Sequence, residues 1–495
     1  MRASKKVKKK QKTKSKRNNL SGFRGFSKVV AVIYLLLSVY FEIEIIRLNI
    51  LPAKYLLPML LILTPVTLII FCILFFNGVT KWKKNLALAI SLILMLTSLM
   101  GTGYATGTIN FLNKISSIGD KVTYETYLVI VPIEAEAETI EDLNETTVGI
   151  YSIPNENYSK ARNDLKEIIA YETSVSDDLD SLATGLLEGK YESILLSETN
   201  YETIEESNDG YQEKTRILYS YDIEDIQRDT ARRIDVTEES FNIFVSGIDV
   251  FGDINKVSRS DVNMIITVNP KTNKILLTSI PRDCSVTLPT YGEKDKLTHA
   301  GLYGVDESIG AVEELLGIEI NYYIKVNFSA VENLVDAIDG IDVDSDYAFT
   351  ARKGGYYYNK GMNHLNGPEA LSFARERYAF REGDFQRVIN QQKVIEAVLK
   401  KISKSTTMLM NYNSILGAVD GNMDTNMAPE DIKALVKMQL NKMPSWEFEK
   451  SSLDEGSDAL MPGYTYGNQK LYVFVPNKDK IIEVEDKINL VMSEE

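Results

Sequence analysis

Two aspartates, each predicted at a strand end, are the first residues whose spacing suggests chemistry. The segment Gly247-Ile248-Asp249 closes one predicted strand, and Ser258-Arg259-Ser260-Asp261 opens the next. A short loop brings the two carboxylates together, and such pairs suit Mg²⁺ when a ligand supplies phosphate oxygens. The same spacing fits a plainer interpretation, in which each aspartate caps its loop or pairs with an arginine.

Arginines form the second group. Arg282 follows Pro281, which ends a predicted strand and pins the backbone, so the guanidinium projects from a rigid edge. Taken alone, the segment is explained better by a surface ion pair between Arg282 and Asp283. Further along, Arg375 and Arg377 lie two residues apart, so they converge only if their helix ends there.

The helix predicted to start at Asp384 adds more polar groups. Arg387 and Gln391 fall four residues apart and therefore share one face of this helix. Four arginines in one place repel each other unless an anion lies among them, and planar guanidinium groups bind phosphate or pyrophosphate in a bidentate manner. The arginine spacing therefore points to a phosphate or pyrophosphate ligand.

Lys296 and His299 lie in the segment Asp295-Lys296-Leu297-Thr298-His299-Ala300. We place Lys296 among the candidate pyrophosphate ligands. A lone histidine is more often structural than catalytic, and this applies to His299 and more strongly to His364.

Strands and helices in alternation must position these groups. The apolar patterns predict strands at 242–247, 262–269 and 274–280, the last two joined by the turn Pro270-Lys271-Thr272-Asn273. Helices are predicted at 306–316, 329–338, 368–376 and 384–402, with Asn366 and Asp384 as N-caps, and the tail adds a helix near 429–440 and a strand at 471–475.

A smaller α/β unit precedes this domain. Its patterns predict strands at 126–131, 147–151, 193–196 and 215–221, and helices at 159–171 and 178–187. It contains no histidine or cysteine and no catalytic constellation, so we expect a scaffolding or binding role. The predicted fold class is thus mixed α/β: transmembrane helices, a small accessory domain, and a catalytic domain with a central sheet flanked by helices.

Three apolar runs at 29–46, 56–76 and 86–105 are each about long enough to cross a bilayer. Glu42 and Glu44 near the end of the first run are expected at the interface, beside Arg47. Twelve Lys/Arg residues in 1–28 and three lysines between the second and third runs belong inside. The N-terminus is therefore expected in the cytoplasm, and residues after about 107 outside.

Charge is segregated along the chain. The first 100 residues hold 17 of the 55 basic and 2 of the 69 acidic residues, which leaves 38 and 67 and a formal net charge of −29 for the rest. A domain this acidic repels nucleic acid, so we expect no nucleic-acid partner. The two cysteines, Cys72 and Cys284, form no disulfide framework.

The predicted division is a basic tail (1–28), three spans (29–107), an accessory domain (120–235) and a catalytic domain (238–495, core motifs 241–405).

The order of these motifs resembles the LytR-CpsA-Psr (LCP) family of Gram-positive cell-wall enzymes. The matching segments are 247–249, 259–261, 280–283, 296–300, 373–378 and 384–392. Within that family, the three-span anchor and the extra outer domain look most like the capsule-associated CpsA branch.

The resemblance implies a phosphotransferase that moves an undecaprenyl-pyrophosphate-linked glycopolymer, capsular polysaccharide in that branch, to a muramic acid hydroxyl of peptidoglycan. It places Mg²⁺ on Asp249 and Asp261, and the pyrophosphate on five residues: Arg282, Arg375, Arg377, Arg387 and Gln391. Catalytic roles are expected for Arg282, Arg375 and Arg377, and our hypothesis is that Asp261 or Asp283 activates the hydroxyl. Expected partners are the lipid-linked glycan, peptidoglycan, the bilayer of the bacterial plasma membrane and other capsule-assembly proteins.

Two other functions remain open at this point. One is a non-enzymatic membrane sensor that regulates capsule biosynthesis, although a simple anion binder would not need paired aspartates. The other is a polyprenyl-pyrophosphate phosphohydrolase, in which water replaces the sugar hydroxyl.

Overall fold

The computed structural model describes residues 2–116, 119, 121–152, 155–208, 210–227, 229–248, 254–255, 258–381, 383–404 and 411–494. The chain forms two compact units. The first comprises Met1–Lys114 with Lys433–Met443, and the second comprises Ile115–Ile432 with Pro444–Glu495.

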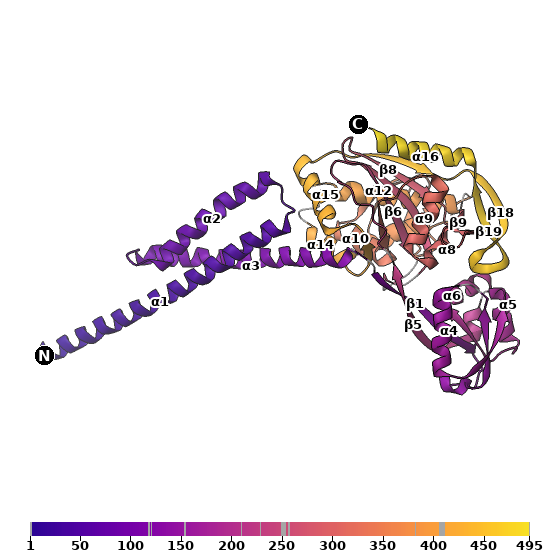
Figure 1. Cartoon of the computed structure of the whole chain (residues 1–495). Coiled ribbons are helices and arrows are strands. Elements are labelled where there is room, and N and C mark those ends of the chain that lie inside the picture. The colour runs from indigo at the N-terminus through magenta and orange to yellow at the C-terminus, as the bar shows by residue number, and fades with distance from the viewer. Residues whose placement is uncertain are drawn as a thin grey trace. The chain divides into compact units, whose positions relative to one another are not determined.

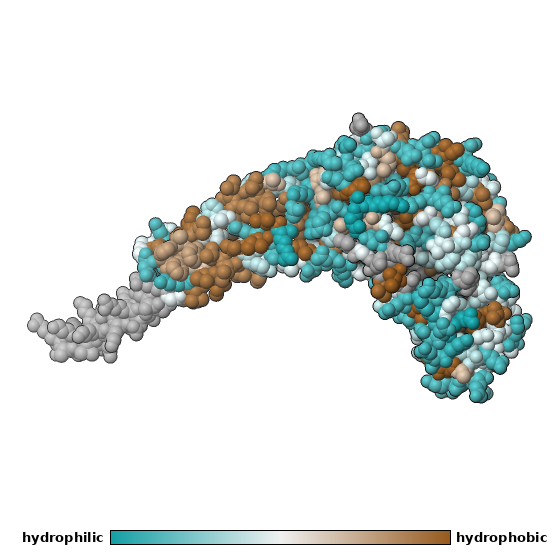
Figure 2. All heavy atoms as spheres, in the orientation of Figure 1, coloured by the Kyte–Doolittle hydropathy of each residue, from teal (hydrophilic) through white to brown (hydrophobic). Residues whose placement is uncertain are grey.

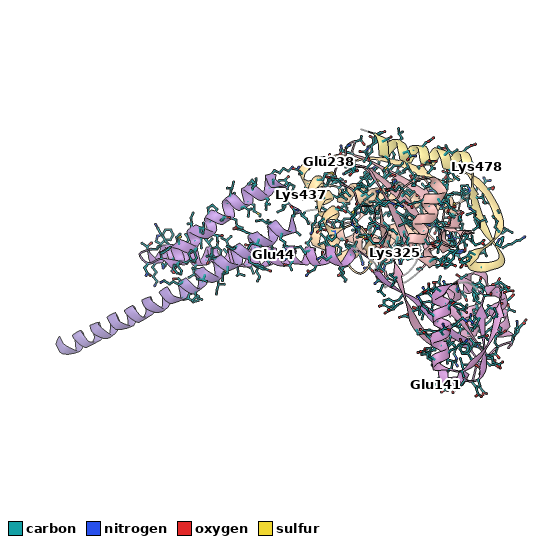
Figure 3. All side chains as sticks on the ribbon, in the orientation of Figure 1. Glu44, Glu141, Glu238, Lys325, Lys437 and Lys478 are labelled. Atoms are coloured by element: carbon teal, nitrogen blue, oxygen red, sulfur yellow. The ribbon has the colours of Figure 1, made fainter. Side chains whose placement is uncertain are left out.

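Three long helices dominate the first unit, and Figure 2 shows their apolar surface in brown. They are α1 (Arg2–Leu48), α2 (Ala53–Phe75) and α3 (Lys81–Ile115). The stretches Gly25–Leu48, Ala53–Phe75 and Lys81–Ile115 are long and apolar enough to span a membrane, which confirms the three predicted spans. Tyr34 donates a hydrogen bond across the helices to Thr67 (3.3 Å). Glu44, labelled in Figure 3, lies 3.7 Å from the guanidinium of Arg47, as the sequence suggested.

The accessory domain is a five-stranded mixed sheet of order β3-β2-β4-β1-β5 (Figure 1). Its strands are β1 (Lys121–Pro132), β2 (Thr146–Tyr151), β3 (Tyr171–Ser176), β4 (Ser193–Ser197) and β5 (Thr215–Gln227). Its helices are η1 (Ile140–Leu143), α4 (Glu156–Ile168), α5 (Leu179–Leu187), α6 (Glu198–Ser207) and α7 (Tyr211–Lys214). The helix predicted for 159–171 was too long: α4 ends at Ile168, and Tyr171 starts a strand that pairs in parallel with β2. Alternating polar and β-branched residues in β3 explain this switch.

A six-stranded mixed sheet of order β16-β11-β6-β7-β8-β17 forms the centre of the larger domain. Its strands are β6 (Phe241–Ile248), β7 (Ser260–Asn269), β8 (Lys274–Ile280), β11 (Tyr322–Val326), β16 (Met423–Thr425) and β17 (Glu447–Ser452). The predicted hairpin joins β7 to β8. Its turn forms because Asn269 accepts backbone hydrogen bonds from Lys271 and Thr272, and Asn273 adopts a left-handed conformation (φ 58°).

Helices cover both faces of this sheet. The helices of this part of the chain are α8 (Leu297–Ala300), η2 (Gly301–Tyr303), α9 (Val305–Leu316), α10 (Phe328–Ala337), α11 (Gly367–Arg375), α12 (Asp384–Ile402), α14 (Tyr412–Val419), α15 (Pro429–Lys442) and α16 (Lys478–Ser493). On one face, Val312 of α9 and Ile488 of α16 share a fully buried core with Ile265 of β7. On the other, Gln392 of α12 donates a hydrogen bond to the backbone of Leu277 in β8. The predicted layered α/β fold is confirmed.

Short strands complete the domain. They are β9 (Ser285–Leu288), β10 (Glu293–Lys296), β12 (Ile341–Ser345), β13 (Phe349–Thr350), β14 (Tyr357–Tyr358), β15 (Gly361–Leu365), β18 (Gly456–Gly463) and β19 (Gly467–Pro476), with η3 (Tyr464–Tyr466) between the last two. This last hairpin reaches the accessory domain, because Tyr466 belongs to that domain's core and Tyr151 donates a hydrogen bond to the backbone of Thr465 (2.9 Å).

Candidate active site

An ion pair between Arg282 and Asp261 is the centre of the candidate site. Arg282 follows β8, and Asp261 lies near the start of β7, its antiparallel neighbour. One guanidinium nitrogen (Nη1) lies 3.0 and 3.2 Å from the two carboxylate oxygens. Burial acts to raise the pKa of Asp261, but the charges of Arg282 and Arg387 outweigh it and hold the pKa below its ordinary value. Asp261 is therefore an ionised carboxylate at neutral pH.

Asp283 and Lys296 extend this cluster. The Lys296 ammonium lies 2.9 Å from one oxygen of Asp283, and Nε of Arg282 lies 3.6 Å from the other. Burial acts to lower the pKa of Arg282, but Asp261 and Asp283 together raise it. The structure thus brings Lys296 next to the arginine site, at the end of β10.

Arg387 approaches from α12. Its side chain is 7% exposed and lies 2.6 Å from the carboxylate of Asp384, one turn earlier. Burial lowers its pKa, and the positive charges of Arg282 and Arg377 act in the same direction. Asp384 was predicted as the N-cap of this helix, and that prediction was wrong: Gly383 (φ 54°) is the N-cap, and Asp384 is the first helical residue. Its carboxylate is therefore directed to Arg387 rather than to the backbone.

Two buried N–H groups make this cluster suited to an anion. The Nε atoms of Arg282 and Arg387 are buried without a hydrogen-bond acceptor among the described residues. An unsatisfied buried donor is costly, so an incoming phosphate oxygen would relieve the cost at both positions. Gln391, one turn beyond Arg387, is also buried (9% exposed) and lies on the same side of α12.

Arg377 and Tyr378 lie just beyond the end of α11. The helix ends at Arg375, as the convergence of the arginines required, and Arg377 donates a hydrogen bond to the Tyr378 hydroxyl (2.7 Å). Arg352 also lies over the Tyr378 ring, 4.7 Å from its centre. The hydrogen bond from Arg377 lowers the pKa of Tyr378, and Arg282 contributes through its charge.

Sequence reasoning missed Arg352 as a member of this group. It precedes Lys353 and two glycines with positive φ, Gly354 (78°) and Gly355 (68°), so a basic pair before a tight turn was the available signal. That signal indicates a loop, but it does not say where the loop lies.

Arg375 takes a different direction from the other arginines. Its guanidinium lies 3.9 Å from the centre of the Phe328 ring, at the start of α10. Phe328 follows β11, whose last residue, Val326, is paired with Gly247 of β6. Arg375 therefore lies near the end of β6.

The structure describes only one of the two predicted metal ligands. Asp249 lies outside the described residues, and Asp261 is paired with Arg282. Among the described residues, there is no group of three or more His, Cys, Asp or Glu side chains that could hold a metal ion. The ionised Asp261 is a hard oxygen donor and fits a Mg²⁺ ion that takes its other ligands from phosphate and water.

Both histidines have structural partners. His299 is buried and its Nδ1 lies 2.5 Å from Asp295, whose second oxygen accepts the backbone N–H of Thr465. His364 lies 2.8 Å from Asp342 on the surface. These contacts agree with the structural roles expected for them.

Comparisons with known proteins identify the family. The family model of the LytR-CpsA-Psr family matches residues 199–488. A polyisoprenyl-teichoic acid–peptidoglycan teichoic acid transferase, TagU from Bacillus cereus, is 37% identical over 245 residues, or 49% of this chain and 76% of that protein. TagU from Enterococcus faecalis is 34% identical over 247 residues (49% and 79%). The crystal structure of TagV from B. subtilis matches with 29% identity and a TM-score of 0.44, covering 52% of this chain and 99% of that one.

This chain belongs to the LytR-CpsA-Psr family, as the motif order predicted. The prediction of an enzyme is also confirmed, because these relatives are transferases. The relatives named above are teichoic acid transferases and not members of a capsule-specific branch. The comparisons therefore identify the family but not the predicted capsule-associated branch.

Proposed function

We propose that this protein transfers a glycopolymer from an undecaprenyl-pyrophosphate carrier to peptidoglycan at the outer face of the bacterial plasma membrane. The observation that carries the proposal is the partly buried cluster of Arg282, Asp261 and Arg387, with two guanidinium N–H groups that have no acceptor among the described residues. The relatives named above support it, since their names specify a polyisoprenyl-linked donor and a peptidoglycan acceptor.

The chemistry is an exchange at one phosphorus. A hydroxyl oxygen of the acceptor sugar forms a bond to the phosphorus that carries the glycan, and the bond from that phosphorus to the bridging oxygen breaks. Lipid monophosphate leaves with the bonding electron pair, and the hydroxyl proton passes to a carboxylate of the site. No ATP is needed, because the pyrophosphate bond is already activated.

Arginines supply most of the catalytic effect in this scheme. Donors fixed before the reaction, and aimed at oxygens that gain negative charge, stabilise the transition state without reorganisation. Arg282, Arg377 and Arg387 are placed for this, with Gln391 and Lys296 as further ligands of the head group. Arg375, whose guanidinium lies over the Phe328 ring near the end of β6, is proposed as a further ligand of the head group.

Asp249 and Asp261 would hold Mg²⁺ in this proposal. The metal would neutralise phosphate charge when it is bound. Because its pKa is lowered, Asp261 is a weak proton acceptor and fits a ligand better than a base. Asp283 is then the better candidate to receive the hydroxyl proton.

Orientation and polymer are part of the same proposal. The basic flanks of the spans favour a cytoplasmic N-terminus and an outer position for residues after about 107. The three-span anchor and much of the accessory domain precede residue 199, where the family match begins. In this proposal the polymer is capsular polysaccharide, because these additional parts resemble the capsule-associated branch of the family, whereas the relatives' names specify teichoic acid.

The test uses the full chain in lipid nanodiscs with labelled lipid-pyrophosphate donors, one carrying a capsular oligosaccharide and one a teichoic acid unit. We expect Mg²⁺-dependent attachment of label to peptidoglycan that is lost in Arg282→Ala and Asp249→Ala and kept in the surface control Arg232→Ala. Donor that is bound but never consumed would favour a sensor. Release of glycan phosphate without attachment would favour a phosphohydrolase.

A further inference from the structure

A polar cleft lies where the accessory domain meets the catalytic sheet. It has a volume of about 220 Å³. On the side of the accessory domain, its walls are formed by the start of α4 and one end of β1 and β5. On the side of the catalytic domain, they are formed by the end of β6, the η2 segment and β11. Because both domains contribute residues, the cleft exists only when they are held together. The contact of Tyr151 with Thr465 and the packing of Gly467 against the backbone of Asp177 provide that connection.

The cleft adjoins the candidate active site. Ile248 and Ser258 line it, and they directly precede Asp249 and Arg259 in the chain. Ser260, which precedes Asp261, is held to β6 by a hydrogen bond between its hydroxyl and that of Ser246 (2.8 Å). A ligand in this cleft therefore lies beside the segment that carries the proposed metal ligands.

The net negative charge of the cleft lining indicates which of the two substrates, the pyrophosphate-linked donor or the acceptor glycan, the cleft can bind. Its lining includes four carboxylates and one ammonium group: Glu125, Glu156, Asp306, Glu307 and Lys325. Figure 3 labels Lys325, the single lysine among them. An anionic polymer or a pyrophosphate is repelled by this balance, and the arginine cluster already provides its site. The cleft is therefore suited to a neutral, hydroxyl-rich ligand.

Side chains in the cleft match a sugar chain in two further respects. Asn155, Asn157 and Thr290 provide uncharged hydrogen-bonding groups. Tyr291 and Tyr303 add aromatic rings to the lining, and these rings are fixed in place because each packs against Tyr464, at ring distances of 4.5 and 5.7 Å. A few placed polar groups beside aromatic faces are typical of a pocket that orients a polar ligand.

We propose that this interdomain cleft binds the glycan strand of the peptidoglycan acceptor and presents its hydroxyl to the phosphorus held at Arg282. The inference rests on the proposed transferase function. It also gives the accessory domain a role, because α4 forms one wall of the acceptor site.

Asn157→Trp tests this wall. Asn157 lines the cleft from the first turn of α4, and an indole ring there fills the space. Asn163→Trp is the matched control, since Asn163 is exposed on the same helix and does not line the cleft. The probe is a tetrasaccharide of alternating N-acetylglucosamine and N-acetylmuramic acid whose lactyl carboxyl groups are capped as amides, so that it is uncharged, and it is titrated into the full chain in nanodiscs.

We expect Asn157→Trp to weaken tetrasaccharide binding and to raise the acceptor KM by about tenfold or more, equivalent to about 1.4 kcal/mol. The donor KM should be unchanged, and Asn163→Trp should behave as wild type. Unchanged tetrasaccharide binding in Asn157→Trp, or a raised donor KM instead, overturns the cleft assignment. If the wild type binds the tetrasaccharide in the cleft but never transfers glycan, the transferase proposal fails and the acceptor site stands.

Discussion

Replacing Arg387 with methionine tests whether its guanidinium group binds the ligand or stabilises the fold. Arg387 is 7% exposed, its Nε has no acceptor among the described residues, and the charges of Arg282 and Arg377 oppose its own. Methionine keeps an unbranched side chain of similar reach and removes the charge. The substitution therefore relieves repulsion at the site while deleting one donor to the phosphate.

The structural cost of Arg387→Met should be small. Removing one partner of a fully buried ion pair costs about 3–5 kcal/mol. Here the remaining partner, Asp384, is 29% exposed. It also lies in the first turn of α12, where the helix dipole stabilises a carboxylate by about 0.3–1 kcal/mol. With the relief of repulsion, we expect a net loss of about 1 kcal/mol, or about 2–4 °C in unfolding temperature for a domain of this size.

The catalytic cost should be larger. Deleting one preorganised donor to a developing oxyanion typically reduces the rate by about 10²–10³. The assay compares thermal unfolding and glycopolymer transfer by the full chain in nanodiscs, with Arg232→Met as the control, because Arg232 pairs with Glu313 outside the arginine site. Loss of more than about 3 kcal/mol of stability, with transfer per folded molecule retained, would show that Arg387 is structural.

Four further outcomes are expected. Because the folded pKa of Asp261 is below its unfolded value of about 3.9, its contribution to stability is full above that pH and is lost as pH falls through the folded pKa. Urea unfolding from pH 7 to 3 should show wild type approaching Asp261→Asn below about pH 4. EDTA should abolish transfer and added Mg²⁺ should restore it; transfer in EDTA would exclude the metal. His299→Ala should cost about 1–3 kcal/mol in thermal unfolding, since Asp295 loses its buried partner, with unchanged kcat per folded molecule. Arg352→Ala should raise the donor KM by about tenfold, and an unchanged KM would place Arg352 outside the site.

Much of the site was predictable because strand ends have clear local signals. Pro281 ends β8 where the apolar pattern stops, so Arg282 was correctly placed at the edge of the sheet. The sequence left two interpretations of Asp261 open, and its pairing with Arg282 belongs to one of them without excluding a metal. Local signals do not show which strands become neighbours in the sheet. The strand order therefore could not be predicted, although it determines which charged residues lie close together.

Elements that depend on tertiary contacts were the ones missed. The edge strand β17 reads Glu-Phe-Glu-Lys-Ser-Ser, which is too polar to show a buried pattern, and it forms because it adds in parallel to β8. Arg352 joins Tyr378 because the loop between β13 and β14 returns toward α11, where the backbone N–H of Arg352 is bound by Glu376. Long-range pairing of this kind leaves no period in the sequence.

The geometry favours charge stabilisation over proton abstraction as the main source of catalysis. A phosphoryl group passes through a loose transition state in which the attacking hydroxyl has formed little bond and needs little help from a base. Asp261, which is paired with Arg282, is held ionised, and this makes it a poor base and a good ligand for a cation. In the proposed reaction, transfer rather than hydrolysis depends on what occupies the space beside Asp261. We therefore expect an acceptor sugar held in the interdomain cleft to favour transfer by excluding water from the phosphorus.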